Sequence, residues 1–179
     1  MMSEQWPIKI LGEVISLEYG KPLPKEDRDP EGQFPVYGAN GEKARSNKFY
    51  HSKPTIIVGR KGSAGELNLT EGKFWPLDVT YFVTFDEEKY EMKFLYYLLQ
   101  SLNLPSMARG VKPGINRNDV YEQTIPLPPL AEQQSIVAQL DAAFAEIETI
   151  ASAISAIKEN YSSLKSAILA QELNPSEAL

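Results

Sequence analysis

The feature that most constrains the fold is the stretch from Leu130 to Gln171, which contains neither proline nor glycine. A strict heptad fits it. Position a takes Leu140, Ile147, Ile154, Tyr161 and Ile168, and position d takes Ile136, Ala143, Ile150, Ile157 and Leu164. Such a repeat is typical of a coiled-coil helix. At about 1.5 Å per residue this helix extends roughly 60 Å, which is longer than a small domain can cover.

The residues at positions a and d form an apolar seam along the helix. This seam predicts association with another helix, from a second copy or from another protein. Val137 and Phe144 widen it near its start, which indicates more than one neighbouring helix. A helix that folds back on its own domain is the alternative. Prolines at positions 126, 128 and 129 predict an extended entry into the helix, and Asn174 to Ser176 predict its end.

Residues 1–125 carry a different pattern, with short β-branched and aromatic runs separated by glycine turns. We expect strands in FPVYGANG (34–41), on both sides of a turn in TIIVGRKGSAGELNLT (55–70), and in FWPLDVTYFVTFD (74–86). Residues 87–102 have helical spacing, and residues 110–120 read as a loop. The predicted fold class is α+β, with a β-rich domain over 1–125 followed by one long C-terminal coiled-coil helix over 126–179.

Composition excludes several classes of site and of location. The 179 residues contain no cysteine, so disulfides, zinc–thiolate sites and cysteine nucleophiles are ruled out. The first ten residues hold no apolar signal core, and no apolar run is long enough to span a bilayer. We therefore expect a cytoplasmic protein without a membrane role.

The net charge of −6 hides an uneven distribution along the chain. Residues 126–179 hold 2 Lys/Arg against 7 Asp/Glu, whereas residues 1–125 hold 16 against 17. Six of these cations lie within residues 36–61, with Glu42 as the only acid, and three more lie within 109–117. Local sign decides where a polyanion would lie, although solvated loops with a basic bias would leave the same trace.

Motifs for common catalytic chemistries are missing. GRKGSAG (59–65) is not a P-loop, because no lysine directly precedes its serine, and its glycines do not follow the dinucleotide-binding spacing. His51 is the only histidine, which rules out a multi-histidine metal site, and no serine lies in a nucleophile elbow. These observations favour a binding domain with basic, glycine-rich loops over an enzyme.

Four segments, in order, carry a resemblance to a known family. They are PVYGANG (35–41), IIVGRKGSAGELN with FWPLDVTYFV (56–68 and 74–83), GVKPGINRNDV (110–120) and IPLPPLAEQQSIVAQLD (125–141). Together they resemble the DNA-specificity subunit of Type I restriction–modification systems. The resemblance implies a target-recognition domain that reads double-stranded DNA and a spacer helix that docks methyltransferase (M) and restriction (R) subunits. It implies no catalysis and no cofactor in this chain, since S-adenosylmethionine belongs to the methyltransferase subunit.

The chain departs from that family in having one recognition domain and one helix, where a typical member has two of each. Our hypothesis is a half-subunit that forms a homodimer through antiparallel helices and reads an inverted repeat with a fixed gap. A truncated product, or a half that pairs with a different half, fits the same sequence. The residues expected in the helix interface are Ile136, Leu140, Ile147, Ile150, Ile154, Ile157, Tyr161, Leu164 and Ile168.

Candidate DNA-binding residues follow from the matching loops and the basic clusters. Arginine and lysine can meet phosphates or guanine edges, and asparagine can pair with adenine. The candidates are Tyr37, Asn40, Arg45, Arg60, Lys61, Ser63, Arg109, Lys112, Asn116 and Arg117. Two alternatives stay open: a protein-interaction adaptor with no DNA role, and a small hydrolase that uses His51 with Asp78.

Overall fold

The computed structural model describes residues 6–173. It forms two compact units, one ending at Gln134 and the other beginning at Ser135. This division lies beyond the start of the long helix, so the boundary predicted between residues 125 and 126 stays a prediction.

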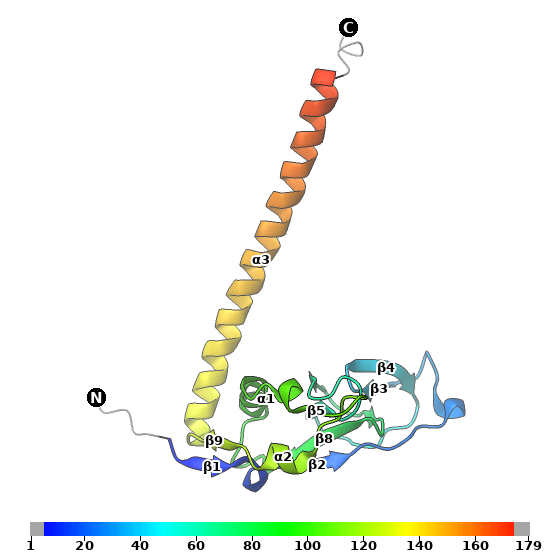
Figure 1. The fold of residues 1–179 in the computed structure, drawn as a ribbon, viewed down its shortest axis with the longest axis vertical. Coiled ribbons are helices and arrows are strands. Elements are labelled where there is room, and N and C mark those ends of the chain that lie inside the picture. The colour runs from blue at the N-terminus through cyan, green and yellow to red at the C-terminus, as the bar shows by residue number, and fades with distance from the viewer. Residues whose placement is uncertain (1–5, 174–179) are drawn as a thin grey trace. The chain divides into compact units, whose positions relative to one another are not determined.

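The first unit is built on a four-stranded sheet with the order β2-β8-β5-β6 (Figure 1). Its strands are β2 (Ile15–Tyr19), β5 (Ile56–Gly59), β6 (Leu67–Leu69) and β8 (Thr80–Phe85), and each neighbouring pair is antiparallel. All four residues of β5 are buried, as are residues 80–83 of β8. These strands are therefore covered on both faces, and the alternation in the sequence of β8 does not mark a face open to water.

Two smaller sheets complete the β structure. β3 (Phe34–Gly38) pairs antiparallel with β4 (Gly41–Ser46) and parallel with the short β7 (Trp75–Pro76). β1 (Ile8–Ile10) pairs antiparallel with β9 (Thr124–Pro126), so segments from the two ends of the first unit lie side by side (Figure 1). The strands expected in residues 34–41, 55–70 and 74–86 are thus confirmed.

Short helices fill the connections. α1 (Met92–Ser101) confirms the helical spacing of residues 87–102 and buries Leu95 and Leu99 completely. Single 3-10 turns form at Leu11–Glu13, Lys25–Asp27 and Leu104–Met107. The prediction of a loop over residues 110–120 was wrong in its second half, where α2 (Arg117–Tyr121) forms. The side chain of Asn116 accepts a hydrogen bond from the backbone N–H of Asn118, which caps and so stabilises this short helix.

The long helix predicted from the heptad is confirmed as α3 (Leu130–Leu173), drawn as one continuous helix in Figure 1. Gln133 in its first turn is buried. Its Oε1 accepts the backbone N–H of Glu91 at 2.9 Å, and its Nε2 donates to the carbonyl of Pro128 at 2.9 Å. These bonds hold the start of α3 within the first unit. The end predicted at Asn174 to Ser176 lies outside the described residues.

The α+β fold class with a long C-terminal helix is confirmed by these elements. Over residues 6–173, no helix is both long enough and apolar enough to cross a membrane.

His51 belongs to an aromatic cluster. Its ring centroid lies 5.4 Å from that of Phe74 and 4.9 Å from that of Phe82, two side chains that pack in the core with Ile57. Burial lowers the pKa of His51, and the charge of Lys53 lowers it further, while Glu87 opposes this shift. The ring of His51 thus packs on two phenyl rings and contributes to the fold.

The lowered pKa predicts a pH dependence of stability. Because the pKa of His51 is lower in the folded state than its ordinary value near 6.5, protonation favours the unfolded chain. The stabilisation is complete above about pH 6.5 and is lost as pH falls through the folded-state pKa. His51→Phe, which cannot titrate, should show a smaller loss of unfolding free energy between about pH 7 and 5 in urea titrations. Equal losses for both proteins would contradict the assignment.

Candidate functional site

Two loops that the sequence marked as basic are joined into one surface. We call residues 59–65 the first basic loop and residues 109–117 the second basic loop. The backbone N–H of Gly62 donates to the carbonyl of Pro113 at 2.9 Å, and that of Ile115 donates to the carbonyl of Arg60 at 3.0 Å. Lys61 and Gly114 also form an isolated β-bridge. These bonds bring together Arg60, Lys61, Arg109, Lys112 and Arg117, which lie up to 57 positions apart in the sequence.

The glycines of the first basic loop have two different roles. At Gly59 the backbone is crowded, since an added Cβ would overlap the carbonyl oxygens of Ser63 and Ala39. Gly62 adopts a φ of +82°, a left-handed conformation, but has open space around it. Gly65 combines both constraints, with a φ of +84° and close contact with Leu104 and Pro105. The loop therefore closes tightly on itself, which fixes where its basic side chains start.

Arg60 and Arg117 share one aromatic neighbour, Tyr19 at the end of β2. The guanidinium carbon of Arg60 lies 5.2 Å from the centroid of the Tyr19 ring, and that of Arg117 lies 5.1 Å from it. Tyr81 pairs with Tyr19 across β2 and β8, and its ring centroid lies 6.0 Å from the guanidinium carbon of Arg60. Cation–π contacts of this kind hold an arginine in place without neutralising its charge.

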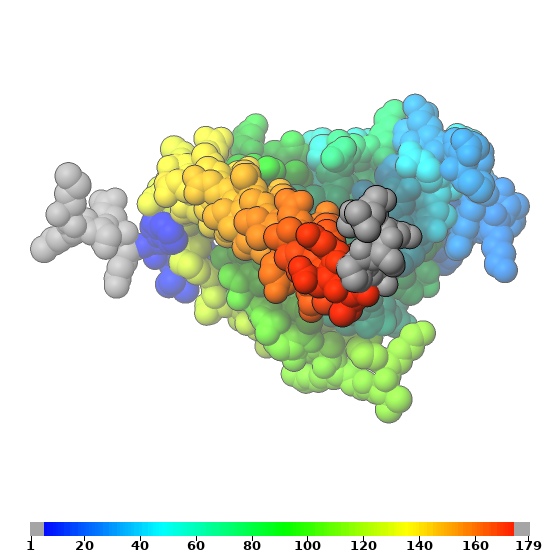
Figure 2. Space-filling model, turned by 90° about the horizontal axis from the view of Figure 1, so that it is seen from above, coloured from blue at the N-terminus to red at the C-terminus, as the bar shows by residue number. Residues whose placement is uncertain are grey.

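The remaining cations of the two loops are exposed to solvent. Lys61 and Lys112 are exposed, and Arg109 forms only a 3.4 Å ion pair with Asp119, in which the Arg109 side chain is 82% exposed. Exposed pairs of this kind contribute little to stability. The segment around residue 110 projects from the edge of the molecule in Figure 2, where it is yellow-green. Its cations are therefore accessible to a large ligand.

Three other predicted residues, Ser63, Asn40 and Tyr37, differ in their surroundings. Ser63 is half-buried within the loop, and Asn40 is exposed in the turn between β3 and β4. The ring of Tyr37 is half-buried against Phe74, with centroids 5.8 Å apart. Burial raises the pKa of Tyr37, and the charges of Glu42 and Glu71 raise it further, so this phenol stays neutral. No contact joins Tyr37 or Asn40 to the arginines around Tyr19 among the described residues.

Arg45 is used within the fold. Its Nε donates to the carbonyl of Gly32 at 2.7 Å, its Nη2 donates to that of Gln33 at 2.9 Å, and its Nη1 lies 3.1 Å from Glu42 Oε1. Every nitrogen of the guanidinium thus has a partner: two lie in the segment before β3, and the third, Glu42, lies in β4. The predicted contact of Arg45 with DNA stays a prediction. The partners of its guanidinium lie outside the two basic loops. Asn116 likewise uses its side-chain oxygen to cap α2.

Sequence reasoning missed the aromatic part of the site. Tyr19 and Tyr81 are 62 positions apart and come together only because β2 pairs with β8, which places their ring centroids 5.1 Å apart. Burial raises the pKa of Tyr81, and a hydrogen bond with the Tyr19 side chain adds to that shift against the opposing charges of Arg60 and Arg117. Only strand register, which the sequence did not supply, could have identified this pair.

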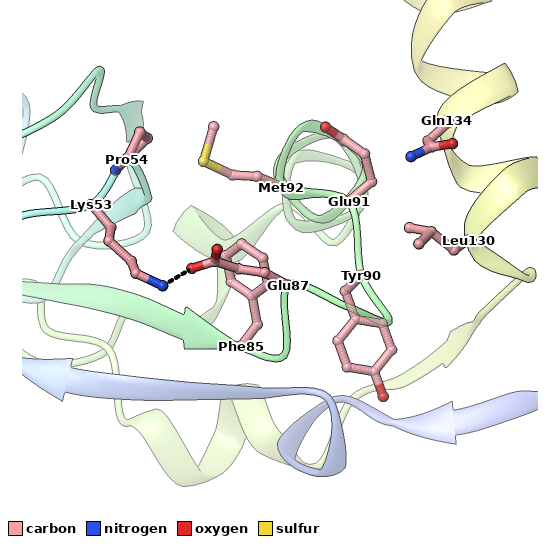
Figure 3. Close-up of a pocket in the computed structure, with 9 residues that line it drawn as sticks. All are labelled: Lys53, Pro54, Phe85, Glu87, Tyr90, Glu91, Met92, Leu130 and Gln134. Atoms are coloured by element: carbon pink, nitrogen blue, oxygen red, sulfur yellow. Dashed lines mark hydrogen bonds and ion pairs between the residues drawn. The ribbon is translucent and has the colours of Figure 1, made fainter.

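A separate pocket of about 360 Å³ lies between the end of β8, α1 and the first turn of α3 (Figure 3). Lys53 and Glu87 form a 2.7 Å ion pair on one side of it, and Met92 and Leu130 supply apolar surface. Elsewhere in residues 6–173, no group of three His, Asp or Glu side chains could hold a metal ion. The joined cations of the two basic loops, Arg60, Lys61, Arg109, Lys112 and Arg117, form the candidate site.

The predicted interface residues of α3 form a second, apolar candidate surface. Seven of the nine are solvent-exposed, with Ile147 59% exposed near the start of the run and Tyr161 68% exposed further along. The others, Ile136 and Leu140, are half-buried. An exposed apolar stripe this long is a mark of an association surface.

Comparison with known proteins gives the family. The family described as Type I restriction modification DNA specificity domain matches residues 3–159. The EcoDI specificity subunit of Escherichia coli is 26% identical over 172 residues, which cover 94% of this chain and 38% of that protein. A putative type I restriction enzyme specificity subunit of Haemophilus influenzae is 31% identical over 116 residues, which cover 62% of this chain and 30% of that protein.

Solved structures show the same fold. The S subunit of a Type I restriction–modification system from M. genitalium superposes with a TM-score of 0.71 at 25% identity, covering 99% of this chain and 52% of that one. The HsdS subunit of Thermoanaerobacter tengcongensis superposes with a TM-score of 0.70 at 21% identity, covering 96% of this chain and 45% of that one. The chain thus spans about half the length of these solved subunits, and less than half of the curated relatives.

The geometry of the first basic loop predicts unequal effects of two similar substitutions. Gly59→Ala should cost about 3 kcal/mol of unfolding free energy, because its Cβ overlaps two backbone carbonyls that cannot move independently. Gly62→Ala, the matched control, should cost about 1 kcal/mol, since only its left-handed φ is strained. Thermal or urea unfolding measures both. A larger loss for Gly62→Ala would show that the loop closes differently.

Proposed function

Because the chain belongs to the Type I restriction–modification DNA specificity family, we propose that its first unit binds double-stranded DNA and performs no catalysis. The observation that carries this proposal is the joined pair of basic loops. Within the described part of the chain, Arg60, Lys61, Lys112 and Arg117 have no carboxylate within ion-pair distance. Uncompensated positive charge on a projecting, hydrogen-bonded surface is suited to a polyanion, even in a chain with a net charge of −6.

We further propose that two copies pair through α3. Specific recognition of a bipartite target needs two DNA-reading units held at a fixed separation, and this chain offers one such unit and one exposed apolar helix. A symmetric pair would present the same contacts twice, and its target would be an inverted repeat with a fixed gap. A complex that contains two different chains would instead show that this chain pairs with a different half-subunit.

The partners of this assembly would supply the chemistry. A methyltransferase subunit carrying S-adenosylmethionine would modify adenine in the target, and a restriction subunit would cleave unmodified DNA. The proposed location is the cytoplasm, where a restriction system meets incoming DNA. The role of this chain is then to choose the site and to hold its partners there.

A protein-interaction adaptor is the second candidate function, and the exposed seam of α3 is the observation that favours it. The adaptor reading assigns no role to the basic loops. The two functions therefore differ in how the first unit responds to DNA and to salt.

Salt dependence separates the two functions. If four unpaired cations meet phosphates, the logarithm of the DNA association constant should fall with the logarithm of salt concentration with a slope of about −3 to −4. Fluorescence anisotropy with a labelled duplex, from low to physiological salt, measures this slope, on the full chain alone and with its methyltransferase partner. If neither preparation binds DNA at low salt, the DNA-binding proposal fails and the adaptor function remains.

The exposed seam predicts the effect of a charge at its centre. Ile154→Asp should convert a dimer into a monomer, because two copies of the new carboxylate would be buried in an apolar interface. Ser155→Asp adds the same charge one position off the seam and should leave the dimer intact. Light scattering at micromolar concentration measures both masses. A wild-type mass equal to one chain would contradict pairing of the isolated protein.

A further inference from the structure

Two arginines, Arg60 and Arg117, carry positive charge beside the single ring of Tyr19. Both guanidinium carbons lie within 5.2 Å of the same ring centroid, and both cations lack an ion-pair partner among residues 6–173. Each guanidinium carbon lies beside the same ring, and no carboxylate of the described residues neutralises either charge. The cluster of Tyr19, Arg60 and Arg117 is therefore suited to an anion.

The fold holds this cluster in place before any ligand arrives. The backbone N–H of Arg60 donates to the carbonyl of Val79 at 2.8 Å, and its carbonyl accepts the N–H of Ile115, so the residue is fixed on both sides. Arg117 begins α2, whose cap is made by Asn116. Tyr19 is 45% exposed at the end of β2, so the cluster is open to a large ligand.

Arg60 has a further feature that limits what it can bind. Its Nε is buried and has no hydrogen-bond partner among the described residues. The terminal Nη groups are then the donors left for a ligand, since Nε is enclosed by protein. The Arg60 side chain is thus enclosed as far as Nε, which leaves its two Nη groups to donate to a ligand.

We propose that Tyr19 is a positioning residue that holds Arg60 and Arg117 together as a binding site for the phosphates of the DNA backbone. This inference rests on the proposed DNA-binding function and names the part of DNA that the cluster meets. Tyr19 acts through the two arginines, whose guanidinium groups make the contact. The ring of Tyr81 contacts that of Tyr19, because the two residues pair across β2 and β8.

Phosphate fits this cluster better than a base edge for two reasons. A guanine edge accepts one bidentate arginine and carries no net charge, so it would leave both cations without a counter-charge. Phosphates carry full negative charge and can accept from several donors, which matches two guanidinium groups placed around one ring. The site would then fix the register of the domain on DNA, and sequence would be read by other residues.

The test compares Tyr19→Leu, Tyr19→Phe, Arg60→Gln and Arg117→Gln in the full chain with its methyltransferase partner. Binding is measured on a duplex selected from a random pool and on a scrambled duplex, each across a range of salt. Arg60→Gln and Arg117→Gln should each lower affinity about tenfold on both duplexes and make the salt slope shallower by about 1. Tyr19→Leu should do the same, whereas Tyr19→Phe, which keeps the ring, should bind within about twofold of wild type.

Arg28→Gln is the control, because it removes the same charge from an exposed arginine that donates to the carbonyl of Leu23 instead of lying against a tyrosine. It should leave affinity and salt slope unchanged. The double variant Tyr19→Leu/Arg60→Gln should lose less than the product of the two single losses, because the ring acts through the arginine. Thermal unfolding of each variant identifies any that fail to fold, in which case the two arginine variants decide the outcome.

Two results would overturn the inference. One is a loss of affinity confined to the selected duplex, which would show a base contact. The other is unchanged binding of Tyr19→Leu, Arg60→Gln and Arg117→Gln. In both cases wild-type binding with a steep salt slope would leave the proposed function standing. If the wild-type complex binds neither duplex, the proposed function itself fails.

Discussion

The pairing of β8 with β2 on one side and β5 on the other determines the candidate site. This register places Tyr19 opposite Tyr81 and Gly59 opposite Thr80, so the end of β2 and the end of β5 meet beside the same strand. The first basic loop leaves from the end of β5, and the second basic loop is hydrogen-bonded to it. A slip of one residue in either pairing would turn these side chains to the opposite face of the sheet and separate the arginines from the ring.

The apolar stripe of α3 sets a second constraint, which concerns association. Fully burying an isoleucine or leucine side chain contributes about 1.5–3 kcal/mol, and the stripe leaves seven large side chains mostly in water. A helix that exposes apolar side chains to water at so many positions gains a large free energy when a matching partner buries them. This constraint and the basic loops act in different units, so DNA reading and assembly can be tested by separate substitutions.

The sequence predicted what depends on local pattern. The heptad predicted α3, the β-branched runs predicted β3, β5, β6 and β8, and the charge distribution pointed to the two basic loops. It could not predict what depends on register. Tyr19 carried no signal as a partner of Arg60, the internal hydrogen bonds of Arg45 were invisible, and the short helix α2 was missed because its five residues follow a loop-like run. Spacing in the sequence describes neighbours along the chain, whereas these contacts form across the sheet.

We propose that this chain chooses a DNA target as one half of a symmetric pair. The most direct measurement is to express it with its methyltransferase partner and map methylated adenines across a genome. If identical copies pair, we expect methylation at one bipartite sequence whose halves form an inverted repeat with a fixed gap. Methylation at targets with two unrelated halves would contradict pairing of identical copies, and methylation that does not depend on this chain would contradict its role in recognition.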